Sequence, residues 1–509
     1  MKTILTRWLH NGKRRIERRL DNTKGRFGRQ PVMTARNIHY DVSDRTHAIT
    51  CGGIGIFHRL ARQLGLIDAI NRRLHLLRIH LPYHESDHVL NFAYNALCGG
   101  RCMQDMEARR TDENFLNALA ARRLPDPTTA GDFCRRFQPA DVETLQDAIN
   151  DVRRRVWARQ PDSFFDCATI DADGTTVGTA GECKEGADFA YDGTWGYHPL
   201  LVSLANTGEV LRIVNRPGNR PSHENAATEL TRAACLCLLA GFRKVLLRGD
   251  TDFSQTKHLD GWNADPKIRF LFGFNAMSNL VEKAEGLPAT AWRRLVRPVR
   301  YSVRTQPRSR PENVKDLVVR ARKYETLRLA SEDVAEFEYR PGACRQSYRM
   351  VVVRKNISKE KGEQVLFDEI RYFFYITNER EWSADEVVFA ANDRCNQENL
   401  IAQLKGGVPA LRTPVDTLVS NWASMVMTAL AWNLKAWWAL TLPEPPGRWR
   451  DRRREEKQRV LRMEFKTFLN RFVLLPCQII KAGRKLIYRL LGWNPDLPTF
   501  FRVASQLKC

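Results

Sequence analysis

The stretch LLRGDTDF, residues 246–253, decides the fold that the sequence predicts. A basic segment, GFRK, runs into it, and the apolar residues then stop at a glycine and two aspartates. The pattern VLLRGD indicates a strand buried on both faces, which is typical of a sheet covered by helices on both sides. Asp250 and Asp252 therefore lie at the carboxyl edge of a predicted central strand. A fold rarely needs two acids there, whereas a divalent metal ion would use them.

The residues around this strand predict an α/β domain. FFDCATIDADGTTVG, at 164–178, is a β-branched and aromatic run that ends in acids and a turn. GYHPLLVSLANTGEVLRIVNRPGN, at 196–219, holds two apolar runs around NTGE, which is a hairpin signal. A helix ending at Gly241 follows, and IRFLFGFN, at 268–275, is a fifth strand. Three strands, a helix, a strand, a further helix and a strand in this order predict a mixed sheet.

Changes of pattern divide the rest of the chain. Apolar residues recur at helical spacing over residues 53–160, and long β patterns such as FEYRPGACRQSYRMVVVRKNI follow the first part of the α/β domain. The predicted segments are a basic N-terminal arm (1–45), a helical DNA-binding domain (46–160), the first part of the α/β core (161–282), a mostly β insertion (283–385), the second part of the core with a third acid (386–442) and a basic helical C-terminal region (443–509).

Charge and composition limit the partners. The 509 residues include 81 Lys and Arg against 58 Asp and Glu, a formal net charge of +23. Such a surplus attracts polyanions, so nucleic acid or an anionic membrane surface is expected. The apolar stretch at 422–442 carries Asn433 and Lys435, which are costly in lipid. It is interpreted as a buried amphipathic helix, with a membrane span as the alternative.

The cysteines and the first residues indicate the compartment. The 12 cysteines include no CxxC pair, so a zinc ribbon is not indicated. MKTILTRWLHNGKRR lacks the apolar core of a signal peptide. Free thiols in a reducing cytoplasm fit these features best.

Two predicted strand ends carry acids that could share a site. Asp171 and Asp173 end the first strand, in TIDADGTT, as Asp250 and Asp252 end the fourth. If both strands are central, their carboxyl ends meet. Carboxylates brought together need a proton or a metal ion, because like charges repel. The other interpretation is that each Asp is an ordinary turn or cap residue.

A third carboxylate is predicted from the helices near 390–405. In DRCNQENLIAQLK, Arg394, Glu398 and Lys405 stand at i, i+4 and i+11, which places them on roughly one helix face. An acid between two bases is usually a surface salt-bridge ladder. The same arrangement could place a metal ligand beside two groups that bind phosphate.

A competing motif is HESDH, residues 84–88, which matches HExxH, where two histidines one turn apart bind zinc. Glu107 would be the third ligand. Asp87 stands just before the second histidine, and the longer metzincin motif is absent. A polar helix start, whose acids the helix dipole favours, is the preferred interpretation. Neither GxxxxGK[ST] nor a full dinucleotide fingerprint occurs, so nucleotide-dependent mechanisms have no support.

Together these pieces resemble the bacterial DDE transposases of insertion sequences, most closely the family known as insertion sequence thirteen-eighty, a relative of the insertion-sequence-four group. The resemblance covers roughly residues 45–440. It rests on IDADGTT, GYHPLLV with RPGN after it, VLLRGDTDF, FYITN, ENLIAQLK and SNWASMVMTALAWNL, in this order. It implies an RNase H-like catalytic core of mixed α/β fold that holds two metal ions with three carboxylates. The long gap before the last acid resembles the β insertion of such relatives.

Carried over by residue, the resemblance implies three metal ligands. Asp173 matches the first, because Asp173 with the next two residues, Gly and Thr, fits the family's Asp-small-Thr. Asp171 is the alternate metal ligand. Asp250 matches the second, and Asp252 is an extra neighbour. Glu398 matches the third.

The related signature Tyr-x2-Arg-x3-Glu-x6-Lys implies DNA contacts. Arg394, Glu398 and Lys405 meet it, but its Tyr position is Ala391 here. Arg394 and Lys405 are therefore expected to grip phosphates. Further DNA contacts are expected beside the second acid and in the basic loop WRRLVRPVRYSVRTQPRSRPENVK, from Arg248, Arg293, Arg294, Arg304, Arg308 and Arg310.

The function that the resemblance implies is a DNA transposase. It would bind inverted-repeat ends, cut them with Mg²⁺-activated water and join the 3′-OH ends to target DNA. Mg²⁺ is the expected cofactor, two ions per site, with Mn²⁺ able to substitute. Double-stranded DNA and a second copy in a synaptic homodimer are the expected partners, in a cytoplasmic, nucleoid-associated protein. The alternatives are a transposase-derived DNA-binding protein that no longer cuts, and a structure-specific nuclease.

Overall fold

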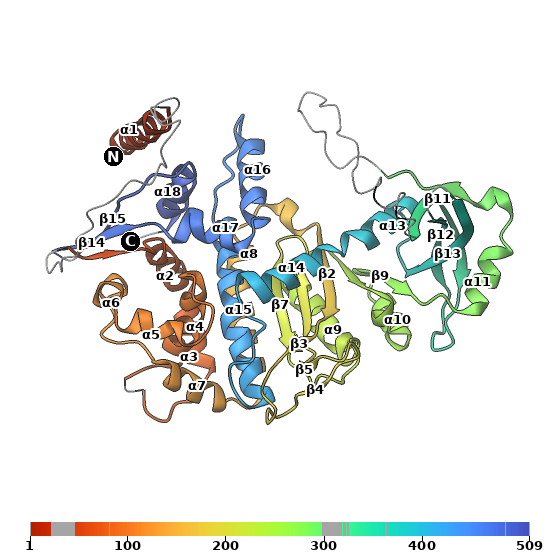
Figure 1. The fold of residues 1–509 in the computed structure, drawn as a ribbon, viewed down its shortest axis with the longest axis horizontal. Coiled ribbons are helices and arrows are strands. Elements are labelled where there is room, and N and C mark those ends of the chain that lie inside the picture. Colours follow the sequence, from red (N-terminus) through yellow and green to blue (C-terminus); the bar gives the residue numbers. More distant parts are fainter. Residues whose placement is uncertain are drawn as a thin grey trace.

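The computed structural model describes residues 2–21, 46–80, 82–297, 325–361, 364–483 and 485–507, with residues 318 and 322. Along its longest axis, a helical region, a central sheet with helices and a segment of long strands follow one another (Figure 1). The predicted mixed α/β fold, with a large mixed sheet, is confirmed.

Five strands form the centre of the main sheet. In spatial order they are β7 (Glu209–Val214), β6 (Leu200–Leu204), β2 (Cys167–Gly174), β8 (Lys244–Gly249) and β9 (Ile268–Phe274). The first three are antiparallel neighbours, and β2, β8 and β9 run parallel. Because β2 and β8 are parallel neighbours, the acids that follow them lie at one edge of the sheet. The hairpin predicted around NTGE joins β6 to β7.

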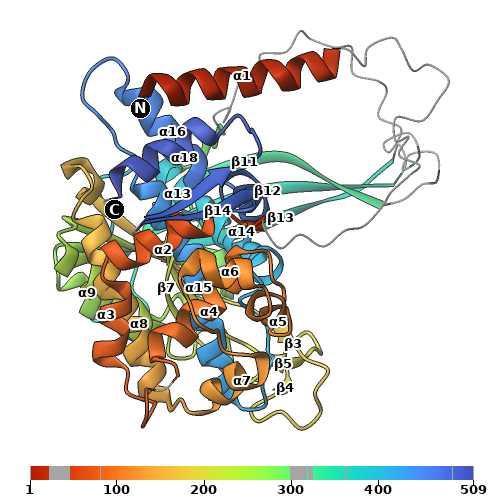
Figure 2. The same ribbon diagram turned by 90° about the vertical axis from the view of Figure 1, so that its left-hand side faces the viewer.

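The sheet continues beyond the five central strands. The four further strands, in order outward from β9, are β13 (Gln364–Thr377), β12 (Tyr348–Lys361), β11 (Glu325–Tyr339) and β10 (Arg293–Arg294). β13 pairs antiparallel with β9, so the strands predicted as an insertion extend the core sheet to nine strands. Figure 2 shows the long strands β11–β13 reaching out beyond the rest of the fold.

Helices and a small sheet complete the core. The helices are α9 (Ala226–Ala240), α10 (Thr256–Asn263), α11 (Ser278–Glu285), α13 (Ala384–Asp393) and α14 (Asn396–Ala402). The end of α9 is fixed by Gly241, whose φ of 106° suits glycine and few other residues. A three-stranded sheet of β3 (Val177–Gly178), β5 (Trp195–Tyr197) and β4 (Asp188–Phe189) follows β2 in the chain.

The apolar stretch at 422–442 belongs to α15 (Leu418–Leu440), which packs between the helical region and the sheet (Figure 1). Asn433 hydrogen-bonds both the N–H and the carbonyl of Val210 in β7. Buried Lys435 donates to the carbonyl of Leu461 at 2.8 Å. These partners confirm a buried helix. None of the helices in the described residues is long and apolar enough to cross a membrane.

Further helices form the helical region and the two ends of the chain. The helices of this region are α2 (Ile54–Gln63), α3 (Leu66–Arg73), α4 (Glu85–Leu97), α5 (Asp105–Arg110), α6 (Glu113–Leu119), α7 (Pro127–Arg135) and α8 (Pro139–Trp157). The N-terminal helix is α1 (Lys2–Asp21), and the C-terminal helices are α16 (Arg450–Leu461), α17 (Phe465–Phe468) and α18 (Leu497–Gln506).

The C-terminal segment holds a hairpin as well as the expected helices. β14 (Cys477–Ala482) pairs with β15 (Lys485–Leu490) and with β1 (Ala48–Ile49) from the other end of the chain. Cys477 and Ile479 are buried while the residues after each are half-buried, the alternation typical of a strand with one covered face. The many basic residues of the segment concealed this short pattern.

Candidate active site

Asp173, Asp250 and Glu398 come from three elements and meet around the side chain of Arg394. Asp173 is the penultimate residue of β2, Asp250 directly follows β8, and Glu398 lies in the first turn of α14. The guanidinium of Arg394 lies 3.3 Å from the carboxylate of Asp173, 4.0 Å from that of Asp250 and 3.9 Å from that of Glu398. The fold therefore brings together the three acids proposed from the sequence.

Arg394 fills the space between the acids. It lies between α13 and α14, with helical backbone angles, and its side chain is only 15% exposed. The sequence interpretation made it a phosphate contact. In this structure it also offsets part of the carboxylate charge.

Burial dominates the electrostatics of the site. It raises the pKa of Asp173 to about 7, an effect that Arg394 opposes and that the nearby Asp250 and Glu398 strengthen. Burial also raises the pKa of Asp250, against the attraction of Arg394. One oxygen of Asp250 accepts a hydrogen bond from the backbone N–H of Asp252 at 2.9 Å, while the Asp252 side chain is exposed. Asp252 is thus a turn residue whose backbone orients Asp250.

The donor set fits a hard divalent cation. Three carboxylates and one guanidinium leave a formal charge of −2 when all are ionised. Such oxygen ligands are those that Mg²⁺ and Mn²⁺ prefer. The three acids surround Arg394 rather than forming a tight cluster of ligand atoms of their own. Among the described residues, the group whose ligand atoms all lie within 4.8 Å of one another is His80, His84 and Glu85.

Comparisons with known proteins place the chain. The family model described as "Transposase DDE domain group 1" matches residues 32–508. The chain belongs to this transposase family. Among solved structures, the cryo-EM structure of a piggyBac transposase synaptic complex with hairpin DNA is similar over 83% of this chain and 82% of that chain, with 11% identity and a TM-score of 0.35. None of the curated proteins compared with the chain matches it. Transposase DDE domains use divalent metal ions, in agreement with the donor set.

The raised pKa of Asp173 gives a stability prediction for the transposase. A carboxyl whose folded pKa is higher than its unfolded pKa keeps its proton longer in the folded state, so stability falls as pH rises from about 4 to about 7. Asp173→Asn removes this loss. We expect the metal-free variant to exceed the wild type by about 4 kcal/mol in free energy of unfolding at pH 8, and to be close to it near pH 4.

Urea unfolding at both pH values, without divalent metal, measures this difference. Asp252→Asn, an exposed neighbour, is the matched control and should leave the stability unchanged. A variant Asp173→Asn that is no more stable than the wild type at pH 8 would contradict the burial argument.

Arg248 and Asp171 pair with each other. Arg248 donates two hydrogen bonds to the carboxylate of Asp171, at 2.7 and 2.9 Å, and a third to the carbonyl of Ala390. Asp171 is 1% exposed and Arg248 is 6% exposed. The register places the two residues opposite each other in β2 and β8. Because each side chain is engaged by the other, we leave Asp171 and Arg248 out of the metal and DNA contacts proposed below.

This pair yields a second stability prediction. Arg248→Ala leaves the carboxylate of Asp171 buried without a counter-charge, so we expect a loss of about 3–5 kcal/mol in free energy of unfolding. The double variant Arg248→Met with Asp171→Leu should lose less, because no uncompensated charge remains. Denaturant unfolding measures both. A single variant that stays stable but binds DNA more weakly would restore Arg248 as a DNA contact.

Three of the remaining predicted DNA contacts, Lys405, Arg293 and Arg294, lie within the described residues. Lys405 is exposed in a π-helical turn, Gln403–Gly407, which changes the helical spacing assumed from the sequence. Burial lowers the pKa of Lys405, and the charge of Asp192 opposes this effect. Arg293 and Arg294 are exposed on β10, where Arg293 pairs with Asp385 at 3.0 Å. The other three predicted contacts, Arg304, Arg308 and Arg310, lie outside the described residues.

A cavity of about 380 Å³ adjoins the site and was not foreseen. Asp250, Ala391, Arg394 and Tyr375 are among its lining residues. Ala391, where the related signature has Tyr, thus leaves open space beside the acids. Tyr375 comes from β13 and brings a phenol to the same space. The motif FYITN was part of the resemblance, but a strand pattern does not reveal that its tyrosine lines the same cavity as an acid two strands away.

Gly174 is required beside Asp173 by a close approach. A Cβ at this position would lie 2.6 Å from Nε2 of His198, and the same ring lies 3.5 Å from the hydroxyl of Ser222. His198 is 2% exposed. This buried histidine therefore packs directly behind the strand end that carries Asp173.

The two histidines of HESDH do not share a site. His88 is buried and stacks on Phe133 with ring centroids 4.2 Å apart. His84 caps α4 and stacks instead on His80, 4.9 Å away. The carboxylate of Glu85 accepts backbone N–H groups at 3.0 Å from the preceding loop. The motif therefore serves as a polar helix start, as preferred from the sequence.

Proposed function

We propose that this transposase binds the inverted-repeat ends of its element, cuts them by metal-dependent hydrolysis and joins the 3′-OH ends to target DNA. The observation that carries the proposal is the meeting of Asp173, Asp250 and Glu398 around Arg394. The acids come from positions up to 225 residues apart in the chain, at the carboxyl edge of a central sheet. Structural acids rarely gather in this way, because their repulsion costs stability.

Asp173, Asp250 and Glu398 would hold the metal ions, two Mg²⁺ per site, with Mn²⁺ as a substitute. When bound, the ions supply an activated water or 3′-OH nucleophile and stabilise the leaving oxygen. Asp250 is held in position by the N–H of Asp252, and the ring of His198 packs against Gly174, the residue after Asp173. Arg394 is the cation nearest to the acids and is the group placed to contact the phosphate that is cut. No covalent enzyme intermediate is needed.

Further features support the finer assignment. Three antiparallel strands, a helix, a strand, a helix and a strand follow one another from β2 to β9, an order that supports an RNase H-like core. The motifs of the insertion sequence thirteen-eighty family support membership of that group. The formal charge of +23 suits double-stranded DNA as the partner. Two ends must be cut together, so the proposal includes a synaptic homodimer in the cytoplasm, associated with the nucleoid.

The test uses the DNA that flanks the gene. Terminal inverted repeats found there are labelled and incubated with the full chain and Mg²⁺ or Mn²⁺, with EDTA as control. We expect strand cleavage that exposes a 3′-OH at the repeat end, followed by joined products with a target plasmid. Cleavage without joining would indicate a structure-specific nuclease. DNA binding without cleavage would indicate a transposase-derived binding protein, and Ala391→Tyr would be the first reversion to make.

A further inference from the structure

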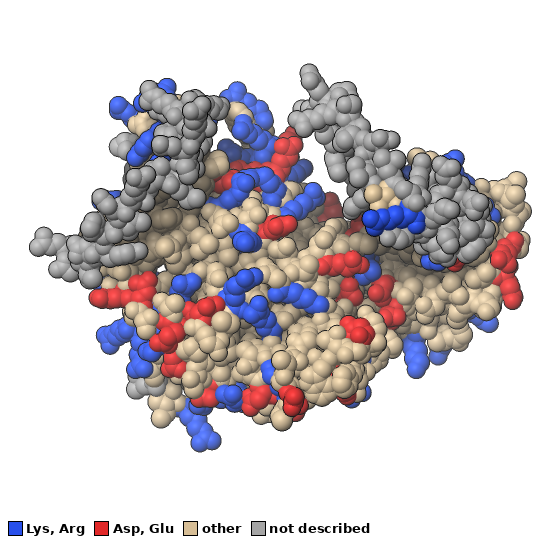
Figure 3. Space-filling view, viewed as in Figure 1, with Lys and Arg blue, Asp and Glu red and all other residues tan. Residues whose placement is uncertain are grey.

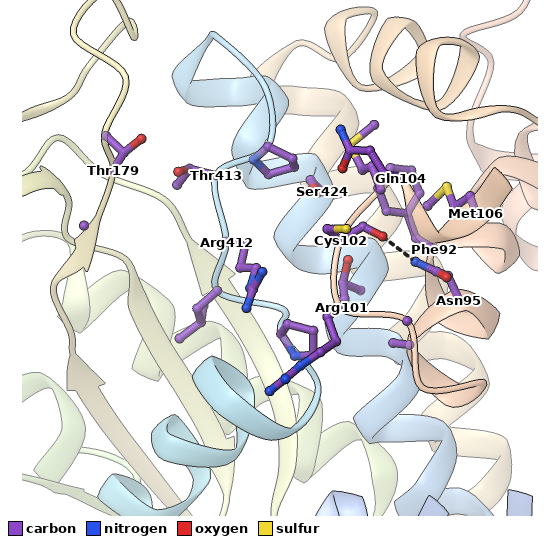
Figure 4. A pocket seen from close by; sticks show the side chains of 18 of the residues that line it. Phe92, Asn95, Arg101, Cys102, Gln104, Met106, Thr179, Arg412, Thr413 and Ser424 are labelled. Atoms are coloured by element: carbon purple, nitrogen blue, oxygen red, sulfur yellow. Dashed lines mark hydrogen bonds between the residues drawn. The ribbon is translucent and has the colours of Figure 1, made fainter. Parts of the chain in front are cut away.

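A cleft of about 390 Å³ lies between the helical region and the core (Figure 4). One wall is the loop that joins α4 to α5, residues 98–104, and the other is formed by residues 178–180 and 409–414. Ser424 and Thr428 of α15 form part of its base. The cleft therefore joins parts of the chain that are distant in sequence.

Arginines from the two walls face the cleft. Figure 4 shows the side chains of Arg101 and Arg412 reaching from opposite walls toward the same space. Both are exposed, and neither guanidinium has an ion-pair partner among the residues that the structure describes. The described residues that line the cleft include no Asp or Glu. Asp105, the closest acid in the loop, accepts the backbone N–H groups of Arg101 and Cys102. The cleft thus presents two positive charges to solvent.

Apolar side chains also line the cleft. Phe92, Met103, Met106 and Leu411 line the cleft together with hydroxyl and amide groups. A single phosphate ion would leave most of the space empty. A chain of alternating phosphates and sugars matches it better, because each sugar has an apolar face and each phosphate suits a guanidinium.

The cleft lies within a short length of chain from the catalytic acids. Thr179 follows Asp173 by six residues, a segment that spans at most about 22 Å when fully extended. The backbone N–H groups of Ala410 and Leu411 also donate to the carbonyl of Leu404, which holds this wall against the turn that carries Lys405. A DNA strand at the acids therefore has this cleft within a few nucleotides.

We propose that the cleft binds the sugar–phosphate backbone of the DNA substrate next to the cut, with Arg101 and Arg412 contacting its phosphates from opposite walls. The inference rests on the proposed function and adds a binding site to it. Its consequence is that one DNA strand contacts both the helical region and the catalytic core, so that binding the strand fixes the two relative to each other. The contacts are to phosphate and carry no base sequence.

Salt dependence tests the charge contacts. Binding of the full chain to a short DNA duplex is measured over a range of salt concentrations for the wild type, Arg101→Ala, Arg412→Ala and the double variant. Each phosphate contact contributes about 0.9 to the slope of log K against log salt, so each single variant should lower the slope by about 1 and the double variant by about 2. Arg345→Ala, an exposed arginine in the turn after β11, is the matched control. Unchanged slopes in both single variants would overturn the inference.

Two native thiols can locate the strand independently, and a third serves as the control. Cys102 lines the cleft, Cys395 lies beside Arg394, and Cys235 is exposed on α9. Duplexes that carry a disulfide-tethered thiol at successive backbone phosphates are incubated with the protein, and cross-linked positions are mapped. We expect Cys395 to react at the cut site, Cys102 to react at phosphates a few nucleotides away, and Cys235 not to react. Cys102→Ser should remove only the second product.

The outcomes separate this inference from the proposed function. Reaction at Cys395 without any reaction at Cys102 would overturn the cleft and leave the catalytic proposal standing. Reaction at Cys102 that is lost in Arg101→Ala and Arg412→Ala would support the cleft. Reaction at neither thiol, with DNA bound, would overturn both.

Discussion

Glu398→Gln is expected to abolish metal-dependent cleavage of the element end while leaving DNA binding intact. The substitution keeps the size of the side chain and removes one of the three charges that we propose to hold the metal. Loss of a group that stabilises charge in the transition state commonly costs on the order of 10³-fold or more in rate. Gel-based cleavage of labelled ends under single-turnover conditions measures the rate, and a filter or gel-shift assay measures binding.

The structure offers a matched control for this loss. Glu282 is exposed on α11 and contacts none of the three acids, so Glu282→Gln should cleave at the wild-type rate. Asp173→Asn and Asp250→Asn should fail to cleave as Glu398→Gln does. A variant of Glu398 that cuts at more than about a tenth of the wild-type rate would remove this residue from the active site.

Glu209→Leu is expected to cost about 3–5 kcal/mol in free energy of unfolding. Glu209 is fully buried, and its carboxylate accepts four hydrogen bonds. The donors are Arg153 at 3.0 Å, Trp157 at 2.9 Å, Trp437 at 2.7 Å and Thr207 at 2.6 Å. They come from α8, α15 and the turn before β7, so this one carboxylate joins the helical region to the sheet. Its removal leaves a buried guanidinium unpaired.

Denaturant unfolding of the variant and wild type measures this cost. Glu209→Gln retains one acceptor oxygen, so its free energy of unfolding should lie between those of Glu209→Leu and the wild type. The exposed pair of Arg380 and Glu338, about half-exposed on both sides, is the control, and Glu338→Gln should cost less than 1 kcal/mol. A loss below 1 kcal/mol in Glu209→Leu would show that the carboxylate does not join the two parts of the fold.

The central strands could be predicted from the sequence because their signals are local. The apolar run that stops at Gly249 forms β8, the residues NTGE join β6 to β7, and Gly241 ends α9. Acids directly after a buried strand then indicate a sheet edge, which is why Asp173 and Asp250 could be proposed as neighbours. Helical spacing likewise placed Glu398 next to Arg394.

The partners of the charged residues could not be predicted. Arg394 and Asp173 stand 221 residues apart, and Arg248 and Asp171 stand 77 apart. Periodicity tells which face of an element a residue occupies, but it does not tell which residue of another element meets it. Arg248 was therefore assigned to DNA although the register of β2 and β8 pairs it with Asp171. The π-helical turn at Lys405 and the phenol of Tyr375 beside the acids arise from packing in the same way.

The central claim is that Asp173, Asp250 and Glu398 hold a divalent metal ion, and Fe²⁺-directed cleavage of the protein tests it most directly. Fe²⁺ is added in place of Mg²⁺, ascorbate and peroxide generate radicals at the bound iron, and the peptide fragments are mapped. We predict breaks next to these three residues, suppressed by excess Mg²⁺ and absent in Asp173→Asn. Breaks confined to the neighbourhood of His80, His84 and Glu85, or no localised breaks at all, would contradict the account.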